Sequence, residues 1–398
     1  MSAALPPSPR VLARVDAGAI AHNLGVLRHW IGGAPGRAPR IWATVKADAY
    51  GHGLCHVLPG LAQADGLAVL NLSEALACRA AGWRGPLLVY GGLQDAAEVE
   101  RLTLDDLHLV ISHAAQLDWL RARDLVHTYA PSLWLRFAGD LNLSGFDAAE
   151  YAPAHARAQA LVALGHARAV HHMNHYAAAE DEQGVAQADA VFRRVIADLP
   201  GLVSTSNSAA LARHRLHAGA TDWVRPGLAL YGASPLAGFT GAGLGLRPAM
   251  SLHSRLMATR QVPAGTSLGY RGAYVSEGEM RVGMVSCGYA DGYPRQAQTG
   301  TPVLIDGVRT RVVGRVSMDM MAVDLGPVPH AQPGAEVLLW GPALPVEEVA
   351  AAAGTIAADL LTGLTGRVPV APAASSQAAA SSRARDGANS RNSVVATR

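Results

Sequence analysis

The sequence has few cysteines and lacks any long apolar run. Its three cysteines, Cys55, Cys78 and Cys287, have the spacing of neither a metal site nor a disulfide pair, so we expect reduced thiols and no metal. No run approaches the roughly eighteen apolar residues of a membrane helix, and residues 1–10, with three prolines, hold no signal-peptide core. These absences predict a cytoplasmic protein that is not exported and has no membrane partner.

An excess of one charge sign is also missing. The formal net charge is +2 at pH 7, and basic residues do not cluster, which gives no support for nucleic-acid binding. Small neutral or zwitterionic substrates fit this balance better. Half of the 398 residues are apolar, and the chain exceeds what one hydrophobic core usually supports. The composition therefore predicts a globular protein of two domains.

Short apolar runs alternate with helix-forming segments before residue 230. Between the runs lie segments rich in Ala, Leu, Arg and Glu, such as 148–164, and Asp16 is placed to cap a first helix. Eight such units in about 220 residues predict a parallel (β/α)8 barrel of the TIM type, and we find no Gly-rich nucleotide turn that would favour a doubly wound sheet. The predicted strands are 40–45, 66–71, 86–90, 107–111, 131–137, 168–173, 201–205 and 222–225.

The pattern changes after Tyr231 into short β-rich runs separated by Gly and Pro. Asp306-Gly307, between two β-branched runs, predicts a two-residue hairpin turn, so the second domain is expected to be mostly antiparallel β. The last residues are Ala, Ser and Arg without apolar periodicity, which is typical of disorder. The predicted divisions are a barrel over 11–240, a β-domain over 241–370 with which residues 1–10 could pack, and a disordered tail over 371–398.

Lys46 stands at the end of the first predicted barrel strand. Active groups of parallel barrels follow the carboxyl ends of the strands. A lysine partly sheltered by apolar neighbours loses part of its preference for the charged form, and its neutral amine can form a Schiff base with a carbonyl such as that of pyridoxal phosphate. The alternative is a lysine that leaves the strand end for solvent.

Further polar residues follow the later strands, and we expect them on the same rim. They are His175, Asn207-Ser208, Arg225 and Gly227. Ser208 opens a predicted helix whose free amides can hold a phosphate, and Gly227 lets the backbone approach the same anion. Each residue also has a structural reading: a helix cap, a hydrogen-bonded histidine, an ion-pair partner or a turn.

Together these motifs resemble the bacterial alanine racemases over roughly residues 10 to 370. The matching runs are Lys46-Ala-Asp-Ala-Tyr-Gly-His-Gly53, Asn207-Ser208, Arg225-Pro-Gly227, Gly288-Tyr-Ala-Asp-Gly-Tyr-Pro-Arg295 and Gly314-Arg-Val-Ser-Met-Asp319. The resemblance implies a homodimer that depends on pyridoxal 5'-phosphate, shares its active sites across the interface and interconverts L-alanine and D-alanine. Such an enzyme would supply D-alanine for peptidoglycan precursors or interconvert alanine for catabolism.

The resemblance also implies a role for each matching residue. Lys46 would hold the cofactor and act on the D-substrate proton, and Tyr270 of the partner would act on the L-substrate proton. Arg225 would face the pyridine nitrogen, which a guanidinium cannot protonate, and this restraint favours racemisation over transamination. The other assignments are Tyr50, Asn207, Ser208 and Gly227 at the phosphate, His175 beside the ring, Met318, Asp319 and Arg136 at the substrate, and Tyr289, Arg295, Arg315, Ile356 and Ala358 at the entrance.

The chain departs from the family pattern at three positions. Arg136 stands where the family has a lysine that becomes carbamylated, and Leu143 stands where it has an arginine that contacts the cofactor's phenolic oxygen and the substrate carboxylate. Losing such a charge-assisted hydrogen bond costs about 1.5–3 kcal/mol. Ala358 replaces a tyrosine that narrows the entrance. Three alternatives follow: a racemase of broader range that accepts serine, a decarboxylase or dehydratase of the same fold, or a catalytically weakened paralogue.

Overall fold

Eight short parallel strands close into a barrel in the computed structural model, which describes residues 9–32, 38–123, 129–182, 184–214 and 221–373. Each strand lies within a predicted run, and β9 pairs with β2 to complete the ring. The predicted barrel is therefore confirmed. The strands are β2 (Arg40–Thr44), β3 (Gly66–Val69), β4 (Leu87–Val89), β5 (Leu107–Ile111), β6 (Ser132–Arg136), β7 (Ala169–Met173), β8 (Val203–Thr205) and β9 (Trp223–Val224).

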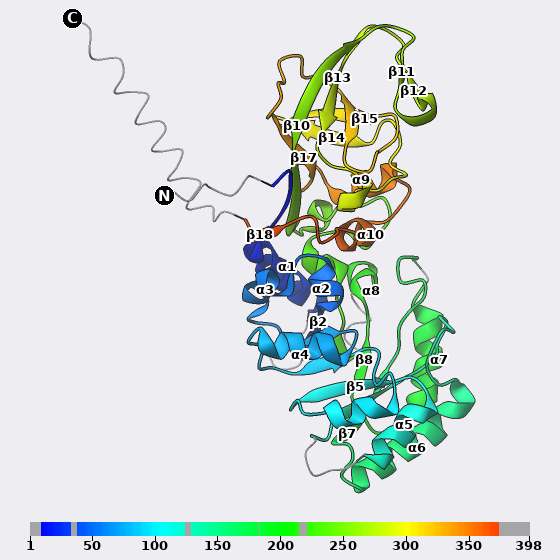
Figure 1. The fold of residues 1–398 in the computed structure, drawn as a ribbon. Helices are drawn as coiled ribbons and strands as arrows, with labels where there is room; N and C mark the ends of the chain where they lie inside the picture. The colour runs from blue at the N-terminus through cyan, green and yellow to red at the C-terminus, as the bar shows by residue number, and fades with distance from the viewer. Residues whose placement is uncertain (1–8, 33–37, 124–128, 183, 215–220, 374–398) are drawn as a thin grey trace, which may run out of the picture.

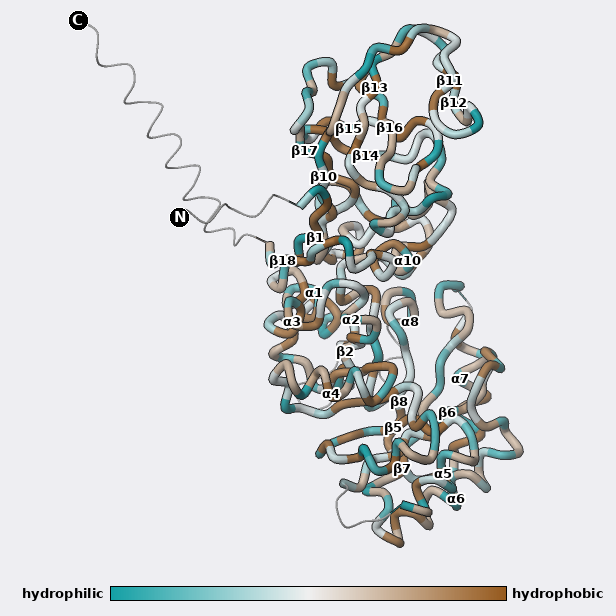
Figure 2. Tube along the Cα trace, in the orientation of Figure 1, coloured by the Kyte–Doolittle hydropathy of each residue, from teal (hydrophilic) through white to brown (hydrophobic). Residues whose placement is uncertain are grey.

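Large aromatic side chains fill the interior of the barrel. Trp42 stacks on Trp223 with ring centroids 3.9 Å apart, and Trp134 meets Trp42 edge-on at 6.3 Å. Gly66 is required beside them, because a Cβ there would lie 2.3 Å from the Trp42 ring. Figure 2 shows hydrophobic residues along interior segments such as β5, while hydrophilic residues mark many of the outer turns. The barrel is thus a packed core, and only its rim is free to bind a ligand.

Helices follow the strands and cover the barrel. Asp16 caps α1 as predicted, its carboxylate accepting from the amides of Gly18 and Ala19 at 2.8 and 3.2 Å. The apolar stripe of α1 is buried against the barrel. These helices are α1 (Ala17–Ile31), α2 (Lys46–Tyr50), α3 (Leu54–Val57), α4 (Leu72–Ala80), α5 (Ala114–Ala122), α6 (Ala148–Ala163), α7 (Ala186–Ile196) and α8 (Ser208–Arg213). None of the helices in the described part of the chain is both long and apolar enough to span a membrane.

The second domain is an eight-stranded, mostly antiparallel sheet in the order β13-β16-β15-β14-β17-β10-β1-β18. The predicted hairpin is present, with Asp306 and Gly307 at φ 47° and 80°. The strands are β1 (Val11–Val15), β10 (Met250–Val262), β13 (Met280–Val285), β14 (Pro302–Ile305), β15 (Val308–Val313), β16 (Met321–Asp324), β17 (Glu336–Trp340) and β18 (Val370–Pro372), beside a small pair of β11 (Ser267–Leu268) and β12 (Tyr274–Val275).

Both ends of the described chain enter this sheet. The sequence-based boundary at residue 11 puts β1 in the barrel domain, whereas β1 pairs with β10 and, in parallel, with β18. The predicted tail begins at 371, but Ala371 and Pro372 still belong to β18. Pairings between residues about 240 and 360 positions apart leave no local pattern in the sequence. Residues 1–8 and 374–398, which include most of the predicted tail, lie outside the described residues.

Two helices of the second domain face the barrel rim. Figure 1 shows α9 (Val346–Ala352) and α10 (Ala357–Thr362) between the sheet and the barrel, and α10 contacts α2, which follows the first barrel strand. The carboxyl ends of the barrel strands therefore open toward the β-domain. Any ligand bound on this rim is enclosed by both domains.

Candidate active site

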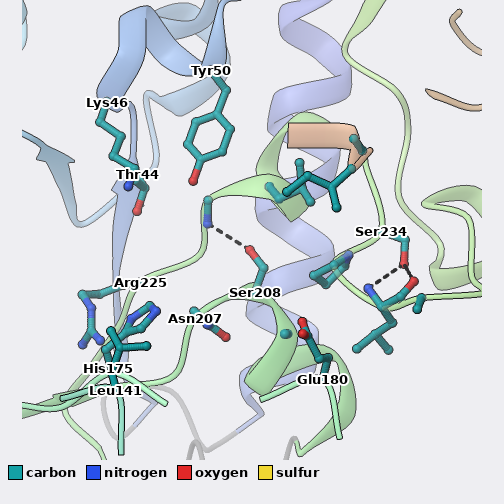
Figure 3. Close-up of a pocket in the computed structure, with 18 of the residues that line it drawn as sticks. Thr44, Lys46, Tyr50, Leu141, His175, Glu180, Asn207, Ser208, Arg225 and Ser234 are labelled. Atoms are coloured by element: carbon teal, nitrogen blue, oxygen red, sulfur yellow. Dashed lines mark hydrogen bonds between the residues drawn. The ribbon is translucent and has the colours of Figure 1, made fainter. Parts of the chain in front are cut away.

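A cavity of about 1100 Å³ lies at the carboxyl ends of the barrel strands. Segments that follow most of the barrel strands line it, and α9 and the start of α10 cover one side. Figure 3 shows the inner part, where Lys46, His175 and Arg225 come from three different strand ends. The cavity also extends outward, past Ser234 and Glu180. This volume is ample for a cofactor and a small substrate together.

The cavity brings together more than half of the residues predicted from the sequence. Those that line it are Lys46, Tyr50, Arg136, His175, Asn207, Ser208, Arg225, Gly227 and Ile356. The predicted residues that do not line the cavity of their own chain are Tyr270, Tyr289, Arg295, Arg315, Met318, Asp319 and Ala358. Ala358 is half-buried on α10, directly after Ala357, which lines the cavity, and the wider entrance at this position stays a prediction.

A left-handed turn fixes Lys46 at the end of β2. The four residues after it, from Ala47 to Tyr50, have φ between 49° and 56°, a conformation that costs about 1–2 kcal/mol per non-glycine residue. The Glu74 carboxylate opposes this cost by accepting from the amides of Ala47 and Leu70 at 2.9 and 2.6 Å. Lys46 is half-buried, and its Nζ lies 5.9 Å from the centroid of the Tyr90 ring. The lysine thus leaves the strand inward, toward the cavity.

Tyr50, Ser208 and Gly227 meet at one side of the cavity. Ser208 Oγ accepts from the amides of Gly227 and Ala229 at 2.9 and 3.2 Å. Tyr50 stacks on Tyr231, and a Cβ at Gly227 would lie 2.4 Å from the Tyr50 hydroxyl. The space beside Gly227 therefore exists only because this residue has no side chain. Hydroxyls and backbone amides gathered in this way suit a phosphate.

Asn207 and Ser208 have separate tasks at the start of α8. The side chain of Asn207 caps the helix by accepting from the amide of Ala210 at 3.0 Å. The structural reading of Ser208 as the cap is therefore wrong, and its hydroxyl is left to face the cavity. Asn207 also lines the cavity, but its side-chain oxygen is already used by the helix.

Arg225 is the most deeply placed cation, with 4% of its surface exposed. Its terminal nitrogens donate to Ser204 Oγ at 2.8 Å and to the carbonyl of Asn174 at 2.5 Å, and both acceptors are neutral. Burial lowers the pKa of Arg225 from its ordinary value, yet a guanidinium stays protonated in proteins. Neither of these hydrogen bonds goes to a carboxylate, so they do not support the interpretation of Arg225 as an ion-pair partner.

His175 is neutral in this setting. Burial, followed by the charges of Arg225, Arg136 and Lys46, lowers its pKa to about 3. Arg136 brings a third cationic side chain to the cavity, and its Nε is buried without a hydrogen-bond partner among the described residues. Burial lowers the pKa of Arg136 as well. Lys46, Arg136 and Arg225 give the cavity three cationic side chains, so the site fits a phosphorylated cofactor and a carboxylate substrate.

Leu143, at the position of the family's arginine, is 81% exposed and does not line the cavity. The nearby Leu141 does line it, but it brings no donor. Thr44 and Tyr90 also line the cavity beside Lys46, and neither was predicted from the sequence. Tyr90 ends the predicted strand 86–90, in the same way that Lys46 follows the first strand, so position at a strand end was the available signal.

Several predicted residues lie on exposed parts of the β-domain. Tyr270 is 70% exposed after β11, and Met318 is 52% exposed in the segment before β16. Asp319 instead forms an ion pair with Arg367 at 2.7 Å. Tyrosine and methionine side chains with this much free surface are common at interfaces.

The comparisons with known proteins agree along the chain. Residues 15–235 match the family model described as "Alanine racemase, N-terminal domain", and residues 249–371 match "Alanine racemase, C-terminal domain". The alanine racemase of Bordetella petrii is 46% identical over 377 residues, which cover 92% of this chain and 99% of that protein. The alanine racemase of Polaromonas sp. is 43% identical over 372 residues, covering 92% of this chain and 99% of that one.

Solved structures give the same result. The biosynthetic alanine racemase from Pseudomonas aeruginosa is 40% identical, with a TM-score of 0.84 and coverage of 91% of this chain and 99% of that one. The alanine racemase from Bartonella henselae, solved with covalently bound pyridoxal phosphate, is 27% identical, with a TM-score of 0.77 and coverage of 91% and 99%.

Proposed function

The chain belongs to the alanine racemase family, and from this premise we propose how its own residues interconvert L-alanine and D-alanine with pyridoxal 5'-phosphate. The observation that carries the proposal is the meeting of Lys46, Arg225 and the Tyr50–Ser208–Gly227 group in one cavity. The readings as a decarboxylase, a dehydratase, a broader racemase or a weakened paralogue are not favoured, since the matching relatives are alanine racemases over nearly their whole length.

The cofactor is assigned to residues of a single chain. Lys46 would hold its carbonyl end, and Tyr50 and Ser208, beside the backbone at Gly227, would hold its phosphate. His175 lies beside the ring as a neutral imidazole, because its pKa is lowered to about 3. When bound, pyridoxal phosphate supplies an electron-withdrawing ring that makes the α-proton of the amino acid easier to remove.

Arg225 limits how strongly that ring withdraws electrons. We assign it to the ring nitrogen, where a carboxylic acid could donate a proton but a guanidinium does not. Its neutral partners, Ser204 Oγ and the Asn174 carbonyl, leave it a full positive charge. With such a partner the bound ring would withdraw electron density from the α-carbon only weakly, which would favour return of the proton to that carbon. This restraint favours racemisation over side reactions.

Inversion needs one proton-transfer group on each face of the α-carbon. Lys46 serves the face of the D-substrate proton, and we assign the L-substrate proton to Tyr270 of a second subunit. Two observations support a homodimer with shared sites: Tyr270 does not line the cavity of its own chain, and it is 70% exposed. Met318, also exposed, would reach the same neighbouring cavity and offer its amide to the substrate carboxylate.

Arg136 is the substrate-binding residue from the cavity's own chain. Its guanidinium lines the cavity, and its Nε has no partner among the described residues, whereas Leu143 lies outside the cavity. The substrate carboxylate can therefore pair with Arg136. The entrance combines Ile356 from the same chain with Tyr289, Arg295 and Arg315 from the second subunit. We keep Asp319 with Met318 at the substrate and Ala358 at the entrance, although neither Asp319 nor Ala358 lines the cavity of its own chain.

We place the enzyme in the cytoplasm. The three cysteines are free in the structure, two of them buried, and free thiols are typical of a reducing compartment.

The test follows protons at the α-carbon of alanine. The purified protein with pyridoxal phosphate is incubated with L-alanine in D2O, and the products are separated on a chiral column. We expect D-alanine and deuterium at the α-carbon, with no carbon dioxide and no pyruvate. Lys46→Ala should abolish both the visible cofactor band and the exchange. Release of carbon dioxide or pyruvate by the wild-type protein would contradict the proposal.

A further inference from the structure

Tyr90 lines the cavity beside Lys46 and has no role in the mechanism above. It follows β4, and its half-buried ring lies with its centroid 5.9 Å from Lys46 Nζ. Its hydroxyl is 3.0 Å from Thr44 Oγ1, at the end of β2, which is separated from β4 by β3. The Arg225 charge also acts on the Tyr90 phenol. Tyr90 therefore lies near both residues assigned to opposite ends of the cofactor ring.

The cofactor ring carries a phenolic oxygen that can accept a hydrogen bond. In pyridoxal phosphate this phenolic oxygen is on the carbon next to the one that bears the carbonyl, so it lies on the Lys46 side of the ring. Leu143 cannot reach it, being exposed and outside the cavity. Arg225 is assigned to the opposite end of the ring, at its nitrogen, where its guanidinium is also held by Ser204 and Asn174. A donor beside Lys46, such as Tyr90, is on the side of the ring where this oxygen lies.

We propose that Tyr90 is a cofactor-binding residue, whose phenol donates a hydrogen bond to the ring oxygen of pyridoxal phosphate next to the carbon held by Lys46. The inference rests on the proposed function for the identity of the cofactor. Tyr90, directly after β4, would thereby supply the donor that the chain lacks at Leu143.

The surroundings of Tyr90 suit a donor. Burial raises the pKa of its phenol, against smaller opposing effects of Arg225 and the Thr44 hydrogen bond, so the proton stays on the oxygen. The backbone of Thr44 is fixed in turn, because its carbonyl accepts a hydrogen bond from the Tyr231 hydroxyl at 2.8 Å. Either hydroxyl of the Thr44–Tyr90 pair can donate, and when Thr44 donates to Tyr90 the phenolic proton is free to point into the cavity. Tyr231 therefore holds the backbone of Thr44, while the side chain of Thr44 positions the Tyr90 phenol.

The test is Tyr90→Phe, which removes the hydroxyl and keeps the ring. Cofactor-free protein is titrated with pyridoxal phosphate, and the visible band is recorded across pH. We expect the dissociation constant for the cofactor to rise roughly ten- to hundredfold, as for loss of a hydrogen bond to a charged group. The pH midpoint of the band should also shift, because the ring oxygen loses its donor. Thr44→Val should shift the midpoint in the same direction by less.

Tyr151→Phe is the matched control. The Tyr151 hydroxyl is buried in the barrel and donates to the carbonyl of Leu135 at 3.0 Å, away from the cavity. This variant should lower the melting temperature and leave cofactor affinity and the band unchanged. If Tyr90→Phe behaves like Tyr151→Phe, with reduced stability and a wild-type band and affinity, Tyr90 only ties two strands together and the inference is wrong. Wild-type turnover of alanine reports on the proposed function separately, since a protein that binds cofactor without racemising would overturn that function alone.

Discussion

Two variants that are each inactive as homodimers should regain activity when one chain of each forms a mixed dimer. Lys46 and Tyr270 are assigned to the same reaction but to different subunits. Tyr270 is 70% exposed and absent from the cavity that Lys46 lines. Removing either acid–base group alone should lower kcat about 10²–10⁴-fold. In a dimer of one Lys46→Ala chain and one Tyr270→Phe chain, one site lacks both groups and the other has both.

The expected recovery follows from this symmetry. The intact site combines Lys46 of the Tyr270→Phe chain with Tyr270 of the Lys46→Ala chain, so a mixed dimer should have about one half of the wild-type kcat. The two chains are co-expressed with different affinity tags, and the mixed dimer is isolated on two columns in succession. Racemisation is then measured in both directions, and the visible band should report cofactor in one site of two.

In the control, the Tyr270→Phe chain is replaced by a chain that carries both Lys46→Ala and Tyr270→Phe. Its mixed dimer with Lys46→Ala has no Lys46 at all, and it must stay inactive. Absence of recovery in the first mixed dimer, with the cofactor band present, would show that Tyr270 does not serve the neighbouring site. Full activity of Tyr270→Phe by itself would refute its role as a base.

Three further outcomes follow from the described contacts. Arg136→Met should raise the KM for alanine roughly ten- to hundredfold while the cofactor band persists, because it removes a charged donor to the substrate carboxylate; an unchanged KM would contradict the assignment. Glu74→Gln should lower the free energy of unfolding by about 1–2 kcal/mol in a denaturant titration, since a carboxamide cannot accept from both Ala47 and Leu70; equal midpoints would argue against this anchor. Burial lowers the pKa of His52 to about 4, so the unfolded chain takes up a proton that the folded one does not, and stability falls as pH drops from about 6.5 to about 4, by up to roughly 3 kcal/mol. His52→Phe should flatten that part of the pH profile of the melting temperature.

Local patterns in the sequence were sufficient for the barrel. Each strand is a short apolar run bounded by polar or small residues, and the helix capped by Asp16 has a regular buried stripe. The hairpin at Asp306-Gly307 was equally predictable, because both residues must adopt positive φ. The position of β1 was not, since Val11, Ala13 and Val15 alternate like any half-buried strand and only distant pairing with β10 assigns them to a domain.

Site residues could be predicted where their position at a strand end is enough to place them on the rim. They could not be predicted where the direction of the side chain determines whether it reaches the cavity. Lys46, His175 and Arg225 follow strand ends, and parallel strands bring their carboxyl ends to one rim. Tyr90 also ends a strand, but an aromatic residue there is equally typical of β-structure. Only the contacts with Thr44 and Lys46 show that its ring turns toward the cavity.

The two halves of the proposed site differ in how firmly they are held. Lys46 is fixed by a left-handed turn that Glu74 anchors, and the cofactor residues all come from one chain. Tyr270 stands in an exposed turn between β11 and β12, next to Arg271 at φ 63°. Cofactor binding should therefore not depend on protein concentration, whereas racemisation should fall when dilution separates the subunits. In the proposed mechanism, the strained turn at Lys46 serves cofactor binding by one chain, and the exposed turn at Tyr270 serves proton transfer, which needs two chains.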